Sequence, residues 1–206
     1  MFDNVAKTEY VDNVKLRIAR LKQIHYIIAI GLFIATFGFC STYHSDFNIT
    51  KMSLSHLGLY KKFGFVWNGG LFIVGITLLI ETILNIRKYI THSKLLYLFI
   101  LSIICLLLTA SITMDHRIHY YFAFAYFIGY TVSIFLFGFV LMKTDFRVGI
   151  TSVIISVASL VLPITVLTYL HSYAIPELTH TACIFIWVGV TKFDSEYKNF
   201  IKRFGL

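Results

Sequence analysis

Six long apolar stretches constrain the fold of this 206-residue chain more than any other feature. A helix needs about 20 apolar residues to cross the hydrocarbon core of a bilayer, with about 17 as the practical minimum. Backbone groups in lipid must be hydrogen-bonded within their own segment, which favours helices. The sequence therefore predicts an all-α integral membrane bundle with six transmembrane helices, at Ile24–Tyr43, Phe63–Ile86, Leu95–Met114, Tyr120–Met142, Gly149–Leu170 and Glu177–Phe193.

Lysine and arginine are shared unequally between the two faces of this predicted bundle. Fourteen fall in the N-terminal segment, the loops after the second and fourth spans and the C-terminal tail, and four fall in the other loops. Cytoplasmic loops carry the excess of such residues, so both termini are expected in the cytoplasm. The net charge of +8 then reflects topology and attraction to anionic lipids, and nucleic acid is not an expected partner.

The chain is expected to form one transmembrane domain with two cytoplasmic extensions. Residues 1–23 form an amphipathic segment, residues 24–193 the six-helix domain, and residues 194–206 a basic tail. The three cysteines lie inside expected spans without a CxxC pair, so we expect neither a disulfide nor thiol chemistry.

The stretch "MDHRIHY", Met114–Tyr120, places an acid, two histidines and an arginine between two apolar runs. The longest outer loop, His44–Lys62, is expected to fold back over the bundle as a short lid. On the predicted topology, most histidines and several acids gather at this outer side: His44, His56, His116, His119, His171 and His180, with Asp46, Asp115 and Glu177. This one-sided distribution predicts an outward-facing polar pocket.

Helical spacing favours a metal site in that pocket. Residues three or four apart share a helix face, as Asp115 and His119, or Glu177 and His180, would do. Glu-x-x-His pairs serve in metal sites of helical bundles, and imidazole with carboxylate suits zinc. We expect Zn²⁺ or another divalent metal, with Asp115 and Glu177 as base or orienting groups and with metal ligands His56, His116, His119 and His180. The structural alternative is that each histidine is a solvated or hydrogen-bonded helix cap.

Other polar residues are candidates for catalysis or substrate binding. Ser55 lies near His56, and a serine beside a histidine can form a nucleophile–base pair, although the chain carries no nucleophile-elbow motif. Asn68 is expected about one and a half turns inside the second span, where its amide needs partners. Together with Asp46 and Arg117, it is a candidate substrate-binding residue.

Several short motifs resemble a family of bacterial and archaeal membrane proteins catalogued as domain of unknown function nine-nine-eight. The family pattern has a Ser-x-Leu-Gly turn, an Asn-Gly opening the second span, a histidine opening the fourth and an acid opening the sixth. The matching residues here are Ser55, Leu57 and Gly58, then Asn68 and Gly69, then His119, then Glu177. The family is similar to eukaryotic FRAG/DRAM/PGAP-type proteins. The resemblance implies six helices in a prokaryotic inner membrane. Because some of the eukaryotic relatives are linked to lipid remodelling, it also points toward a lipid substrate.

Two classes of function follow from these observations. The first is a metal-dependent hydrolase or transferase that acts on a lipid headgroup. Its inventory of serine, aspartate and histidine is chemically similar to that of the alkaline ceramidase and adiponectin-receptor hydrolases. Those proteins have seven helices, and their paired histidines are four apart near the last one. The second class is non-enzymatic: a transporter, a sensor of protons or a ligand, or a membrane scaffold.

Overall fold

The computed structural model describes residues 27–87 and 93–204, with the side chains of residues 85, 93 and 193–204 left out. All regular structure in these ranges is helical. A first helix, Ile27–Tyr43, precedes a short 3-10 helix, η1 (Leu54–Leu59). The remaining elements are α2 (Gly64–Glu81), a π-helical segment (Thr82–Ile86), α3 (Ser93–Ser111), α4 (Arg117–Met142), α5 (Phe146–Leu170) and α6 (Ala174–Phe204).

Five of these helices are long and apolar enough to cross a membrane, namely those that contain α2 to α6. The first helix is apolar but is described over only 17 residues, since the structure describes nothing before Ile27. The all-α membrane class is therefore confirmed, whereas the count of six spans and the cytoplasmic placement of both termini stay predictions. The expected amphipathic segment 1–23 lies outside the described residues.

Two helix boundaries differ from the sequence-based expectation in ways that affect the site. The third helix ends at Ser111 and α4 begins at Arg117, so Asp115 lies in a turn and not on a helix face. The last helix runs from Ala174 to Phe204, well beyond Phe193, because nothing in the polar tail before Gly205 breaks a helix.

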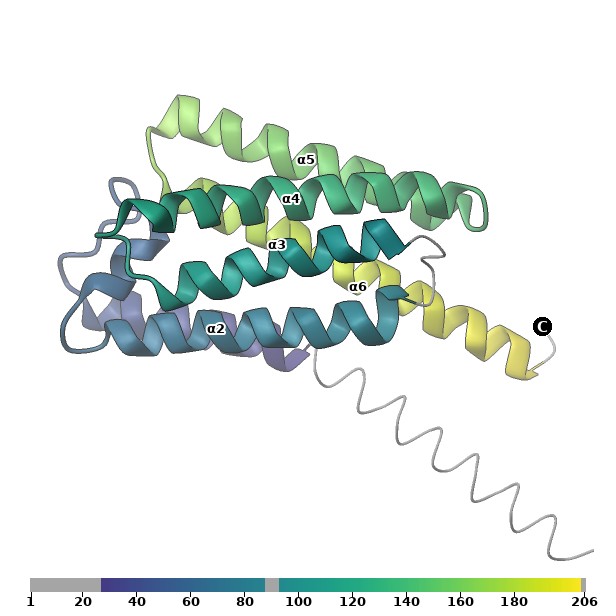
Figure 1. Cartoon of the computed structure of the whole chain (residues 1–206), viewed down its shortest axis with the longest axis horizontal. Helices are drawn as coiled ribbons and strands as arrows, with labels where there is room; N and C mark the ends of the chain where they lie inside the picture. The colour runs from purple at the N-terminus through teal and green to yellow at the C-terminus, as the bar shows by residue number, and fades with distance from the viewer. Residues whose placement is uncertain (1–26, 88–92, 205–206) are drawn as a thin grey trace, which may run out of the picture.

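Successive helices run antiparallel, and the longest loop lies at one end of the bundle together with two short connections (Figure 1). These are the α3–α4 turn, residues 112–116, and the α5–α6 turn, residues 171–173. We call this the η1 end. Residues distant in sequence are thereby brought to one end, as the alternation of spans and loops predicted.

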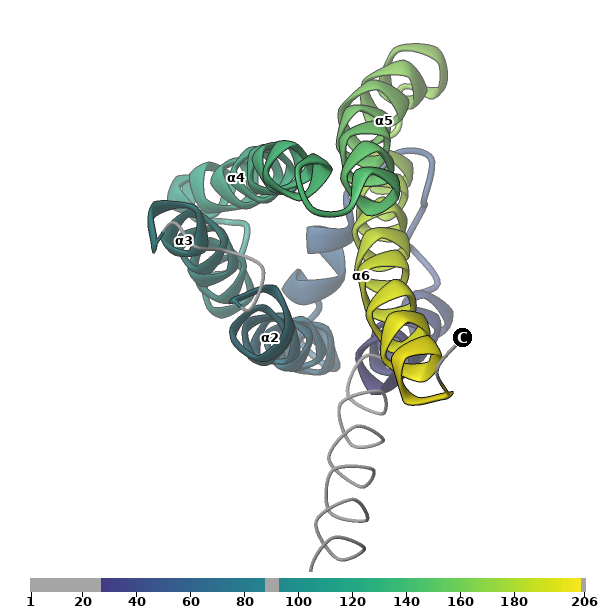
Figure 2. The ribbon, with the colours of Figure 1, turned by 90° about the vertical axis from the view of Figure 1, so that its right-hand side faces the viewer.

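The long loop folds back into the bundle, and η1 lies in the space that the longer helices enclose (Figure 2). Leu54 and Leu57 of η1 are buried in the core. Three hydrogen bonds tie the loop to the start of α6: Ser172 Oγ donates to Ile49 O at 2.6 Å, Ala174 N to Met52 O at 3.0 Å, and Leu54 N to Glu177 Oε2 at 2.6 Å. These bonds fix the position of the part of the loop that carries Ser53 and Ser55.

Helices α4 and α5 are in close contact at the end opposite η1 and diverge toward the η1 end (Figure 1). Gly138 and Gly149 allow the close contact, since a Cβ on either would collide with the backbone carbonyl of the other. Only 17% of the most apolar window of α5 is buried, against 33–44% for the other four spans. Between the diverging parts of the two helices lies a cavity whose wall includes Phe124 of α4 and Leu160 of α5.

Gly149→Ala is expected to destabilise the protein by about 1–3 kcal/mol, because the added methyl group meets rigid backbone atoms of Met142 and Gly138. Gly69→Ala in α2 is the matched control, since a Cβ there has no neighbour within 4 Å and alanine has the higher helix propensity. Thermal unfolding in detergent measures both. Equal midpoints for the two variants would contradict the close contact of α4 with α5.

Candidate functional site

The central feature of the η1 end is a serine–histidine pair formed by Ser55 and His119. His119 is buried in the first turn of α4, and its Nδ1 lies 2.6 Å from the carbonyl oxygen of Ile112. A carbonyl only accepts hydrogen bonds, so Nδ1 carries the proton and Nε2 is the acceptor of the neutral ring. The Ser55 hydroxyl lies 2.9 Å from that Nε2 and donates to it. Nucleophile, base and orienting acceptor thus form one chain.

The neighbouring His56 is held in the opposite tautomer. Its Nδ1 lies 3.1 Å from the backbone nitrogen and 2.9 Å from the hydroxyl of Ser53. A backbone N–H only donates, so Nδ1 is the acceptor and Nε2 bears the hydrogen. His119 therefore offers a base at Nε2, whereas His56 offers a hydrogen-bond donor at Nε2. This complementarity is set by the backbone contacts of the two rings.

Both histidines line the cavity between α4 and α5, which has a volume of about 650 Å³. Its polar end is at η1, where Ser53, Ser55, His56, His119 and Glu177 contribute to the wall. The rest of the wall is largely apolar, and several of its side chains are exposed on the outer surface of the bundle: Phe124, Ile128, Leu160, Ile164 and Leu167. The cavity is therefore amphipathic, and its apolar wall continues onto the exposed faces of α4 and α5, two of the helices apolar enough to cross a membrane.

A second polar group lies farther along the same cavity. Thr131 Oγ1 of α4 is 2.9 Å from Nε2 of His180 on α6 and 3.1 Å from Oγ of Ser159 on α5. All three side chains are at least 95% buried. Hydrogen bonds in an apolar interior are strong and directional, so this triplet fixes the relative rotation of three helices. His180 and Ser159 also line the cavity.

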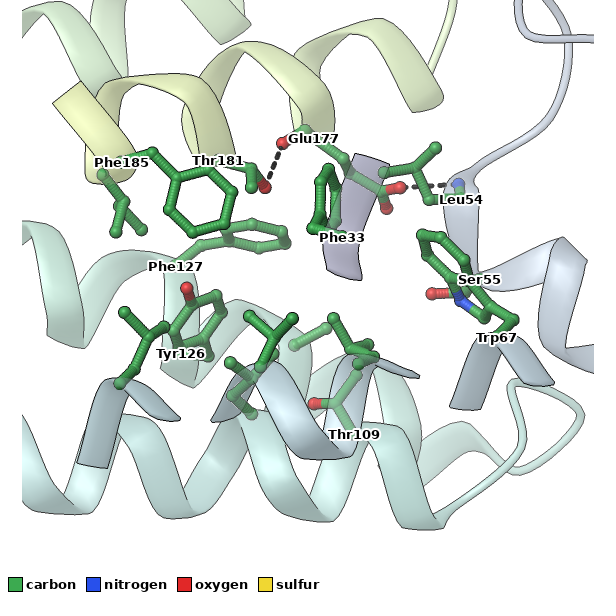
Figure 3. Close-up of a pocket in the computed structure, with 16 residues that line it drawn as sticks. Phe33, Leu54, Ser55, Trp67, Thr109, Tyr126, Phe127, Glu177, Thr181 and Phe185 are labelled. Atoms are coloured by element: carbon green, nitrogen blue, oxygen red, sulfur yellow. Dashed lines mark hydrogen bonds between the residues drawn. The ribbon is translucent and has the colours of Figure 1, made fainter. Parts of the chain in front are cut away.

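A smaller chamber of about 50 Å³ lies on the other side of Ser55, in the centre of the bundle (Figure 3). The two cavities share four wall residues: Ser55, Ala123, Phe127 and Glu177. In Figure 3, Glu177 reaches from α6 to the backbone nitrogen of Leu54, and the Tyr126 hydroxyl is turned toward the interior of the chamber. The carboxylate of Glu177 thus lies at the boundary between the chamber and the cavity.

The structure brings together about half of the site residues expected from sequence. Ser55, His56, His119, Glu177 and His180 line one cavity. The side chains of Asp46, Asp115, His116 and Arg117 are exposed outside it, and Asn68 packs against Gly58 of η1. A hydrogen bond from the Thr113 hydroxyl lowers the pKa of Asp115, whose nearest ionisable neighbour is His116 at 3.9 Å. Asp115 therefore belongs to a solvated turn.

The geometry gives the expected metal site little support. Among residues 27–87 and 93–192, no group of three or more histidine, cysteine, aspartate or glutamate side chains is arranged to hold a metal ion. His119 uses both ring nitrogens for hydrogen bonds, and His56 uses Nδ1. Zn²⁺ held by His56, His116, His119 and His180 stays a prediction, which metal analysis of the purified protein would test.

The apolar helices and the polar site within them define a polytopic helical protein of membrane character. A family model described as "Protein of unknown function (DUF998)" matches residues 27–193, and the chain belongs to that family. The resemblance seen in the sequence motifs is thereby confirmed. The comparison with curated proteins and the comparison with solved structures each found no match.

Proposed function

We propose that this protein is a membrane-embedded acyl hydrolase or acyltransferase whose nucleophile is Ser55 and whose base is His119. The observation that carries the proposal is the hydrogen-bonded chain from Ser55 Oγ through the His119 ring to the Ile112 carbonyl, at the polar end of an amphipathic cavity. In this role Ile112 O replaces the carboxylate that orients the histidine in many such sites.

The shape of the cavity favours an amphiphilic substrate that enters from the bilayer. A ligand pocket of this kind has a volume of about 300–1,000 Å³ and few polar groups. The apolar wall from Phe124 to Leu167 suits an acyl chain, and the η1 end suits a polar headgroup. The scissile ester or amide carbonyl then lies beside Ser55, where the apolar wall meets the polar η1 end of the cavity.

The chemistry follows from the two tautomers. His119 Nε2 takes the hydroxyl proton as Ser55 Oγ attacks the carbonyl carbon, and it returns that proton to the leaving alcohol or amine. His56 Nε2–H is available to donate to the oxyanion that develops on the carbonyl oxygen. The products of this half-reaction are an acyl ester on Ser55 and the freed alcohol or amine.

Covalent labelling tests the proposal directly. The full-length protein in detergent micelles is treated with a long-chain alkyl fluorophosphonate, and labelled peptides are identified by mass spectrometry. We expect one adduct on Ser55, absent in Ser55→Ala and retained in Ser53→Ala, since the Ser53 hydroxyl is hydrogen-bonded to His56 Nδ1 whereas that of Ser55 is hydrogen-bonded to His119. A folded wild-type protein without an adduct on Ser55 would rule out the nucleophile.

A non-enzymatic carrier is the second candidate, and the exposed apolar wall of the cavity favours it independently. A carrier would bind a fluorescent fatty-acyl lipid with the same affinity in wild type and Ser55→Ala. It would release no product and form no covalent adduct. The same preparations used for labelling therefore distinguish the two functions.

A further inference from the structure

The inner chamber contains polar groups that the proposed acylation step does not use. Tyr126 is 5% exposed, and its hydroxyl forms no hydrogen bond with another described residue. It is turned into the chamber, as Figure 3 shows. The Glu177 carboxylate forms part of the same wall, and its Oε2 accepts a hydrogen bond from the backbone nitrogen of Leu54. A polar group that faces a cavity in an apolar interior gains free energy from a hydrogen-bond partner there, so the chamber favours a small polar occupant.

The size of the chamber limits what that occupant can be. A cavity needs about 10–15 Å³ of this kind of volume to hold one water molecule, and the chamber offers about 50 Å³. Apolar side chains form most of the remaining wall, among them Phe33, Trp67 and Phe185. Water fits this space and can bond to Tyr126 and Glu177, whereas a lipid fragment or a headgroup does not fit.

We propose that the chamber between Tyr126 and Glu177 holds the water that hydrolyses an acyl group on Ser55, which makes the reaction hydrolysis rather than transfer. This inference rests on the proposed function. Ser55 forms part of the wall of both cavities, so an acyl group that reaches Ser55 from the larger cavity between α4 and α5 lies next to the chamber. Tyr126 and Glu177 are positioning residues for that water.

The deacylation step balances with the groups present. The water oxygen bonds to the acyl carbonyl carbon as one water proton passes to His119 Nε2. The bond between that carbon and Ser55 Oγ then breaks, and His119 returns the proton to Oγ. The products are a free carboxylic acid and regenerated Ser55. No second alcohol or amine acceptor is consumed.

Burst kinetics with a chromogenic long-chain ester test the inference on the full-length protein in micelles. Tyr126→Phe is expected to keep the initial burst, which reports acylation, and to lower the steady-state rate about tenfold through loss of one hydrogen bond to water. Glu177→Gln is likewise expected to lower the steady-state rate and to keep the initial burst. Added hydroxylamine, a stronger nucleophile than water, is expected to restore turnover in Tyr126→Phe. A merely structural defect would lower burst and steady state together.

Thr77→Val is the matched control, because Thr77 of α2 lines neither cavity and its hydroxyl likewise donates to a helix carbonyl, that of Ile73. It is expected to deacylate at the wild-type rate. Wild-type deacylation rates in both Tyr126→Phe and Glu177→Gln would overturn the water site and leave Ser55 acylation standing. Absence of any burst in the folded wild type would instead remove the proposed function and this inference with it.

Discussion

His119→Ala is expected to lower the turnover of a long-chain ester by about 10²–10⁴-fold, the usual contribution of a general base. In the wild type, the Ile112 carbonyl fixes the proton on Nδ1 and leaves Nε2 to accept the hydrogen of Ser55. Without the ring, the Ser55 hydroxyl loses the base to which it is hydrogen-bonded and remains a weak nucleophile. The measurement is initial-rate kinetics in micelles, normalised to folded protein.

His116→Ala is the matched control for this loss. His116 lies three residues away, but its side chain is 67% exposed and contacts Asp115, so its removal is expected to leave turnover within twofold. Because His119 is buried, His119→Ala is also tested with added imidazole, which has room to enter the larger cavity. Partial recovery of turnover by imidazole would support the role of His119 as the base. Equal losses of turnover in His116→Ala and His119→Ala would show that both changes disturb the N-terminus of α4, and that His119 does not act as the base.

The sequence was most informative about the features that depend on the length of its apolar runs. The long apolar runs predicted the helical membrane class and the gathering of loops at one end, because bilayer thickness restricts such runs to few structures. The same alternation placed Ser55, His119, Glu177 and His180 at one end of the bundle. Their meeting in one cavity required the loop to fold back, which the bonds from Leu54 N to Glu177 and from Ala174 N to Met52 stabilise.

The chemistry of the site was harder to predict, since backbone groups decide it. The orienting acceptor for His119 is the carbonyl of Ile112, which any residue type would supply. Helical spacing paired Asp115 with His119, but α4 begins only at Arg117, and the turn directs Asp115 to solvent. Thr131 and Tyr126 lie among many similar helix residues, and their roles depend on the rotation of α4, which a single sequence does not specify.

Glu81→Leu is expected to destabilise the protein by about 3–5 kcal/mol, because it removes the carboxylate that lies 3.5 Å from the buried Lys192 ammonium. The two groups join α2 to α6 at the end opposite η1, with 3.5 Å between Nζ and Oε1 and with only 7–8% of either side chain exposed. Charges at this depth in a membrane protein are costly unless paired. The free energy of unfolding in mixed micelles measures the loss. Lys143→Met removes an exposed charge at the same end and is expected to change stability by less than about 0.5 kcal/mol.

The double variant Glu81→Leu with Lys192→Met is expected to recover most of the stability lost by the single change. Two well-packed apolar side chains replace a buried ion pair at little or no cost, because neither charge must then be desolvated. A double variant as unstable as Glu81→Leu alone would show that the pair stabilises the fold beyond mutual neutralisation. A stable double variant with altered ester turnover would instead connect the pair to the site at the η1 end. The π-helical segment that begins directly after Glu81, a type of distortion frequent at functional sites, makes that second measurement worthwhile.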